Sequence, residues 1–331
     1  MSNSRNAVRR SVRLLVGLAL VLFVHVPAAV AADANPSGGL LRVGYQKYGS
    51  LVLLKARGTL EKRLSALGIE VRWTEFPSGP VLLEALNVGS IDFGQAGETP
   101  PIFAQAAGAN LVYVANEPPE PSGEAILVPR NSPLKSVADL KGKKVALNKG
   151  SNVHNLLVRL LEKAGLQYKD VETAFLPPAD ARAAFERGSV DAWVIWDPFL
   201  AAAEKQIGAR VLADGKGVVS NHPFFLASRP YAEKRVDVVA IVVEELAKVD
   251  AWARQSPKEV AAYLAPQLGL DPSTVELSIS HNSFGVKPVS DAVLAEQQKI
   301  ADTFYELKLI PRRIDVRAAT IARDGTAQAK R

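Results

Sequence analysis

Cysteine is absent from the 331 residues of this chain. That absence excludes disulfides, thiolate nucleophiles, iron–sulfur clusters and zinc sites built on cysteine. The chain has only 4 histidines, too widely spaced for a metal-ligand motif, and it lacks G-x-S-x-G, H-E-x-x-H and phosphate-loop patterns. We therefore expect a protein that is not an enzyme and has no catalytic residue, metal or cofactor.

Acidic residues are also absent from residues 1–32, which carry four arginines within the first 13 positions. An apolar run at 14–26 and a stretch of small residues follow, the layout of a secretory signal peptide cut after Ala31 or Ala32. The alternative is an uncleaved anchor, but a spanning helix needs about 20 apolar residues. We predict that residues 1–32 are a signal peptide and that the mature protein resides in the periplasm.

Little net charge remains once that segment is set aside. The whole chain carries +6, of which the four arginines account for most, leaving +2. Such a balance argues against nucleic-acid binding, which depends on a strong positive field. The length suits two α/β domains, and 48% hydrophobic with 22% charged residues is typical of soluble globular proteins.

One structural unit occurs twice in the mature chain. Gly89-Ser-Ile-Asp92 recurs as Gly188-Ser-Val-Asp191, 99 residues later, and the flanking segments follow in the same order. Each copy predicts a strand–helix–strand–helix–strand unit, the first with one helix over 51–67. Such units form a mainly parallel sheet flanked by helices. The sequence therefore predicts an α/β protein of two lobes facing a common cleft.

The lobe boundaries follow from where the chain crosses between the two copies. Proline-rich residues 117–125 and the segment 219–225 fit those crossings. The expected division is a first lobe of residues 40–120 and 225–311, a second lobe of residues 121–224, and a basic tail, 312–331, that frays.

The loops that lead from strands into helices are rich in glycine and hydroxyl groups. Ligands of open α/β sheets lie at such loops, and helix N-termini offer unpaired N–H groups to anions. This composition favours a small oxyanion held by neutral N–H and O–H donors. The alternative is that Ser78, Ser151 and Asn152 cap their own helices.

The positions of three aromatic residues and one histidine near these loops indicate their roles. Strand alternation places Trp193 in the core and Trp196 at the strand's end, where it either lines the cleft or packs. Phe103 fits a core position. His154, one turn into a predicted helix, either reaches the ligand or packs.

Several stretches resemble the aliphatic sulfonate-binding proteins of ABC importers, and the resemblance runs from about Leu41 to Leu309. They are residues 83–94, 97–105, 138–145, 148–152, 177–182 and 191–198. The resemblance implies a type II periplasmic binding fold with its ligand cleft between the lobes. It also implies a monomeric carrier that closes on an organosulfonate and delivers it to a membrane permease for sulfur acquisition.

The same resemblance implies a set of ligand contacts in the loops. These are Gln46, Ser78, Gly79, Gly97, Glu98, Thr99, Glu124, Ser151, Asn152 and Trp196. Ala96 stands where many relatives have a small hydroxylated residue, which leaves ligand preference open. Taurine, nitrate or another small oxyanion is the alternative ligand. A less favoured alternative is an enzyme similar to pyrimidine-precursor synthases, whose cysteine-rich motif this chain lacks.

Three carboxylates of the predicted cleft resemble an acid/base set: Glu98, Glu124 and Asp197. We expect them instead to hold or repel ligand groups, or to link the lobes. An acid near an anion site also excludes ligands by repulsion.

Overall fold

The computed structural model describes residues 39–321. The predicted signal peptide and residues 322–331 lie outside this range. Within it, no helix combines the length and hydropathy needed to cross a bilayer.

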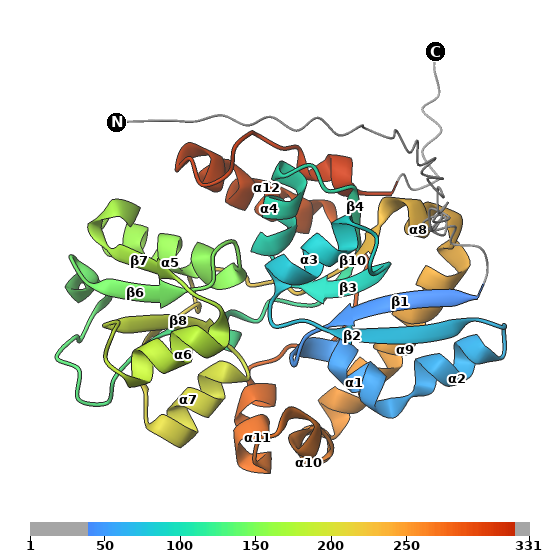
Figure 1. Cartoon of the computed structure of the whole chain (residues 1–331), viewed down its shortest axis with the longest axis horizontal. Coiled ribbons are helices and arrows are strands. Elements are labelled where there is room, and N and C mark those ends of the chain that lie inside the picture. Colours follow the sequence, from blue (N-terminus) through green and yellow to red (C-terminus); the bar gives the residue numbers. More distant parts are fainter. Residues whose placement is uncertain (1–38, 322–331) are drawn as a thin grey trace, which may run out of the picture. The chain divides into compact units, whose positions relative to one another are not determined.

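Two five-stranded sheets organise the chain (Figure 1). Both have the same topology, in which four strands run parallel and the fourth strand in spatial order runs antiparallel. The predicted α/β class and repeated unit are thereby confirmed. The first sheet has the order β2 (Glu70–Glu75), β1 (Leu40–Tyr45), β3 (Phe93–Ala96), β10 (Phe224–Ser228), β4 (Leu111–Asn116); the second has β7 (Glu172–Phe175), β6 (Lys144–Leu147), β8 (Ala192–Trp196), β5 (Glu124–Val128), β9 (Arg210–Asp214).

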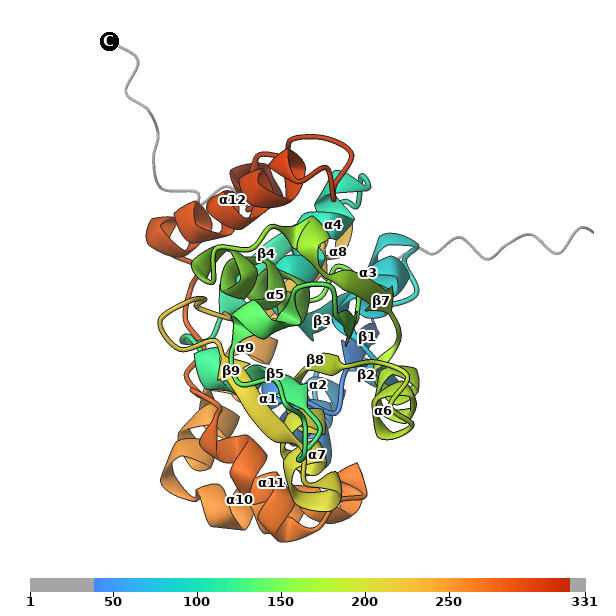
Figure 2. The same cartoon turned by 90° about the vertical axis from the view of Figure 1, so that its left-hand side faces the viewer.

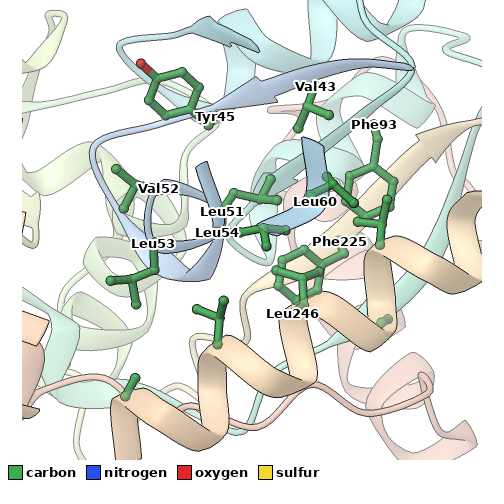
Figure 3. Packing of buried hydrophobic residues seen from close by; sticks show 14 of the residues in the cluster. Val43, Tyr45, Leu51, Val52, Leu53, Leu54, Leu60, Phe93, Phe225 and Leu246 are labelled. Carbon is green, nitrogen blue, oxygen red and sulfur yellow. The ribbon is translucent and has the colours of Figure 1, made fainter. Parts of the chain in front are cut away.

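Helices cover both faces of the first sheet, and together they form the first lobe. Alternation along β10 sends Phe225 to one face and Phe224 to the other, so each face has its own apolar core. Figure 3 shows the first core, where Leu51, Leu54 and Leu246 pack around Phe225. The helices of the first core are α1 (Gly49–Arg57), α2 (Thr59–Ser65), α8 (Arg229–Lys234), α9 (Val236–Gln255), α10 (Pro257–Leu268) and α11 (Pro272–Ser280); those of the second are α3 (Gly79–Asn87), α4 (Thr99–Ala106) and α12 (Asp291–Glu306).

The second lobe is built around the second sheet and a single apolar core. Its helices are α5 (Asn152–Lys163), α6 (Pro178–Glu186) and α7 (Phe199–Ile207), with short 3₁₀ turns η1 (Pro121–Gly123), η2 (Val137–Leu140) and η3 (Tyr168–Asp170). Trp193 is fully buried in this core, as predicted. Helix α7 also packs against α11 of the first lobe, a helix outside the predicted strand–helix units.

The predicted helix over 51–67 is wrong in one respect, because it is two helices. Gly58 adopts φ +62°, a left-handed conformation that ends α1 and precedes α2. Only glycine takes this conformation without a steric penalty, which is why the chain bends there.

Two segments join the lobes and lie side by side. The chain passes from β4 to β5 through residues 117–123 and returns from β9 to β10 through residues 215–223. Backbone hydrogen bonds connect them, from Glu117 N to Pro223 O (2.9 Å) and from Gly215 N to Pro121 O (3.0 Å).

The prediction that the basic tail frays from residue 312 is wrong for residues 312–321. The Arg312 side chain donates hydrogen bonds to the carbonyl oxygens of Gln105 and Ala106 at the end of α4. The 3₁₀ turn η4 (Val316–Ala319) then buries Val316 against the first lobe.

Figure 2 shows α12 above the sheets, and α10 with α11 below them.

Candidate functional site

A small pocket lies where loops of both lobes meet the crossing segments. Each lobe supplies part of its wall, and the two crossings supply the remainder. Its lining consists of Gln46, Tyr48, Gly79, Gly97, Pro100, Gly123, Ser151, Asn152, Trp196 and Asn221.

Four helices begin at this pocket. Tyr48 precedes α1, Gly79 opens α3, Pro100 lies in the first turn of α4, and Asn152 opens α5. A helix N-terminus carries unpaired N–H groups and roughly half a positive charge. The lining residues in the described chain include no lysine or arginine. The pocket is therefore suited to an anion held by neutral donors.

The two serines that precede these helices do not cap them. Within residues 39–321, neither Ser78 at α3 nor Ser151 at α5 makes a side-chain capping hydrogen bond. The Ser151 hydroxyl donates instead to the carbonyl oxygen of Asn148 (2.7 Å). The capping alternative is therefore wrong for both serines, and the Ser78 hydroxyl is not engaged by its own helix.

Buried hydrogen bonds hold the first-lobe side of the pocket. The Gln46 amide donates to the Gln95 carbonyl oxygen (3.0 Å). The Tyr48 hydroxyl donates to Glu120 on the first crossing (2.8 Å), and burial raises the pKa of Tyr48 well above its usual value. The bond to Glu120 holds the Tyr48 ring beside the pocket.

Asn152 ties the second lobe to the second crossing at the pocket. Its Nδ2 donates to Glu124 Oε2 (2.5 Å) and to Asn221 Oδ1 (3.1 Å) on the second crossing. Asn221 has φ +51°, a conformation that asparagine tolerates better than most residues. Its own Nδ2 donates to the Glu120 carbonyl oxygen (2.9 Å).

The acidic side chains lie just behind the pocket wall. Glu98 lines a neighbouring cavity and accepts hydrogen bonds from Asn155 Nδ2 (2.7 Å) and His222 N (3.3 Å). Burial raises the pKa of Glu98 to about 7. Burial likewise raises the pKa of Glu124 well above its usual value. Both carboxyls therefore retain protons more readily than exposed acids do.

Asp197 joins the two lobes, which is one of the roles that the sequence predicted for it. Its carboxylate is fully buried at the end of β8, accepts a bond from Ala201 N (3.1 Å) and contacts His281 Nδ1 (2.7 Å), which follows α11. Within residues 39–321, no group of three histidine or acidic side chains is arranged to hold a metal ion.

The structure brings the predicted contacts together at one place. Six of the ten line the pocket: Gln46, Gly79, Gly97, Ser151, Asn152 and Trp196. The other four, Ser78, Glu98, Thr99 and Glu124, are absent from its lining in the described chain but directly adjoin residues that line it. Thr99 and Glu124 each bury one oxygen that has no hydrogen-bond partner among residues 39–321.

Sequence reasoning missed four lining residues: Tyr48, Pro100, Gly123 and Asn221. Pro100 lies in the segment 97–105, which carries the resemblance, and Tyr48 stands two residues after Gln46, so both could have been found from their neighbours. Gly123 and Asn221 belong to the crossings, and only the pairing of those segments brings them to the pocket.

Trp196 supplies an apolar wall. It is the last residue of β8, is buried, and packs edge to face on Phe199 with ring centroids 6.1 Å apart. Of its two readings, the structure therefore supports the one in which it lines the pocket.

The chain is similar to known proteins along most of its length. The model of the NMT1-like family matches residues 41–268. The aliphatic sulfonates-binding protein of Escherichia coli (strain K12) is 50% identical over 309 residues, which cover 92% of this chain and 95% of that protein.

Solved structures agree with this similarity. The alkanesulfonate-binding protein SsuA from Xanthomonas axonopodis pv. citri, bound to MOPS, matches with a TM-score of 0.82 and 47% identity over 86% of this chain and 98% of its own. The periplasmic aliphatic sulphonate binding protein SsuA from Escherichia coli matches with a TM-score of 0.78 and 48% identity over 89% and 97%. The resemblance predicted from the motifs is confirmed: this chain belongs to the NMT1-like family and, within it, to the aliphatic sulfonate-binding proteins.

Proposed function

We propose that this chain is a periplasmic solute-binding protein that captures an aliphatic sulfonate by interlobe closure. It delivers the ligand to the permease of an ABC importer, acts as a monomer and performs no catalysis. The names of its relatives support the ligand class and the carrier role. The predicted signal peptide supports the periplasmic location.

One observation carries this proposal. Four helix N-termini converge on a pocket whose lining, in the described residues, contains no lysine or arginine. A sulfonate is charged at every physiological pH, so it needs no ionised partner to stay anionic. Helix N–H groups and side-chain amides or hydroxyls stabilise it without burying an unpaired cation in the empty protein. We place the sulfonate oxygens beside Gly79, Ser78 and Asn152.

The aliphatic part of the ligand needs apolar contacts. Trp196 and Pro100 face the same pocket and offer them. The Xanthomonas relative was solved with MOPS, itself an alkyl sulfonate with a bulky end. The ten predicted contacts are therefore proposed as the residues that hold the headgroup and the first carbons of the chain.

Isothermal titration tests the proposal. The panel is ethanesulfonate, longer alkanesulfonates, taurine, nitrate and sulfate. We expect an alkanesulfonate to bind best, with a Kd near micromolar, about −8 kcal/mol. Preference for nitrate or sulfate over every alkanesulfonate contradicts it, and so does conversion of a bound sulfonate detected by mass spectrometry.

A further inference from the structure

Helix α5 contacts the first lobe well beyond the ligand pocket. Its first residue, Asn152, lines the pocket, and its next turns present Asn155 and Arg159 on the same helix face. Asn155 donates to Glu98, and Arg159 Nη2 donates to Thr303 Oγ1 of α12 (2.8 Å). One rigid helix therefore touches the ligand site at its start and the opposite lobe along its length.

An aromatic cluster lies on this seam. His154 of α5 contacts two rings of the first lobe, Phe304 of α12 (centroids 5.1 Å apart, 69° between planes) and Phe103 of α4 (6.1 Å, 35°). Phe103 and Phe304 pack edge to face at 5.1 Å. His154 and Phe304 are fully buried. Gly150, beside the pocket, packs closely on this cluster, because a Cβ there would lie 3.1 Å from Phe103.

His154 behaves as a neutral ring in this cluster. Gly150 N donates to its Nδ1 (3.3 Å), so Nε2 carries the proton and donates it to the Tyr168 hydroxyl (2.7 Å). Burial, with the nearby Lys149 charge, lowers the pKa of His154 to about 3. The second lobe therefore holds an uncharged, oriented imidazole against the rings of the first lobe.

We propose that Phe103, His154 and Phe304 form an interlobe latch that sets ligand affinity without touching the ligand. The inference rests on the proposed capture of a sulfonate by closure. None of the three residues is part of the pocket lining in the described chain. Opening the cleft separates His154 from both phenylalanines and exposes buried ring surface to water. The latch therefore favours the closed state, and a ligand that binds this state gains affinity in proportion to its population.

Two variants test the latch, and a matched third serves as control. Phe304→Leu and Phe103→Leu keep an apolar side chain in the first-lobe core but remove the ring contacts. Tyr263→Leu removes an edge-to-face pair with Trp252 (5.8 Å, 86°) and a hydrogen bond from the Tyr263 hydroxyl to the Ala56 carbonyl oxygen (2.8 Å), both within the first lobe. Titration with ethanesulfonate should show a Kd raised roughly 3- to 30-fold for either latch variant and unchanged for the control.

Distances between the lobes provide a second readout. Substitutions that only weaken packing within one lobe would leave these distances unchanged. The chain has no cysteine, so spin labels attach only at two introduced positions, Val88→Cys just after α3 and Arg187→Cys just after α6. Without ligand, the latch variants should show longer distances than the parent protein; saturating ethanesulfonate should restore the parent distance. Folded variants whose Kd stays within twofold of the parent's and whose distances are unchanged overturn the latch. If the parent protein fails to bind ethanesulfonate, the proposed function fails, and the ligand-free distances still decide the latch.

Discussion

The backbone of Gly97 in the first lobe lies so close to Asn152 in the second that a Cβ at Gly97 would be 2.9 Å from Asn152 Cγ. Gly97→Ala should therefore prevent full closure. We expect a Kd for ethanesulfonate at least about tenfold higher, with little change in the unfolding temperature, measured by titration and calorimetry. Equal affinities for the Gly97→Ala variant and the parent would contradict closure through this contact.

Ser78 and Ser290 precede helices in the same way but act differently. Ser78 makes no side-chain cap in the described structure, whereas the Ser290 hydroxyl accepts a bond from Val293 N (3.3 Å). Ser78→Ala should weaken sulfonate binding about 3- to 10-fold and leave stability nearly unchanged. Ser290→Ala should lower the free energy of unfolding by about 1 kcal/mol and leave the Kd unchanged. Denaturation and titration of both variants check this, and the reverse pattern would refute it.

Glu98 should make stability depend on pH. Burial raises its folded-state pKa to about 7 from the ordinary 4.5, so the folded protein binds this proton more tightly than the unfolded chain. The contribution of Glu98 to the free energy of unfolding should therefore fall by about 3 kcal/mol as pH rises from 4.5 through 7. Glu98→Gln should remove that part of the slope.

The same group should affect ligand binding. Ionised Glu98 stands behind Gly97, close to the proposed anion site. We expect ethanesulfonate to bind more weakly above pH 7 in the parent protein and equally well on both sides of pH 7 in the Glu98→Gln variant. Titrations at pH 6 and pH 8 measure this. A parent Kd that is constant over this range would show that the charge of Glu98 does not reach the ligand.

The His281–Asp197 pair should stabilise the folded protein at low pH and lose this effect as pH rises. The hydrogen bond to Asp197 raises the pKa of His281 above its ordinary 6.5. Its stabilisation is therefore complete below pH 6.5 and is lost as pH rises through the raised value. His281→Ala should cost about 2 kcal/mol at pH 6 and clearly less at pH 9, measured by denaturant titration. A larger loss at pH 9 would contradict this assignment.

The repeated motif was readable from sequence because its contacts are local to each unit. Asp92 accepts a hydrogen bond from Arg42 N (2.9 Å), and Asp191 accepts one from Lys144 N (2.8 Å). Each aspartate thus ties the third strand of its unit to the first. The same residue type at the same place predicted the same topology in both lobes.

Features that depend on distant segments could not be predicted in this way. Asn221 reaches the pocket only because the two crossings pair, and the side chain of Glu98 points into a neighbouring cavity because Asn155 and His222 hold it there. The docking of residues 312–321 depends on the end of α4, more than 200 positions away. No local pattern encodes such contacts.

The position of the sulfonate headgroup beside Gly79 and Asn152 can be tested directly because of the chain's composition. Cysteine is absent and the one methionine is Met1, so residues 2–331 contain no sulfur. Crystals grown with ethanesulfonate in sulfur-free buffer should give one strong anomalous sulfur peak beside Gly79 and Asn152 at long wavelength. A peak beside a lysine or arginine elsewhere, with none in the pocket, would contradict the account.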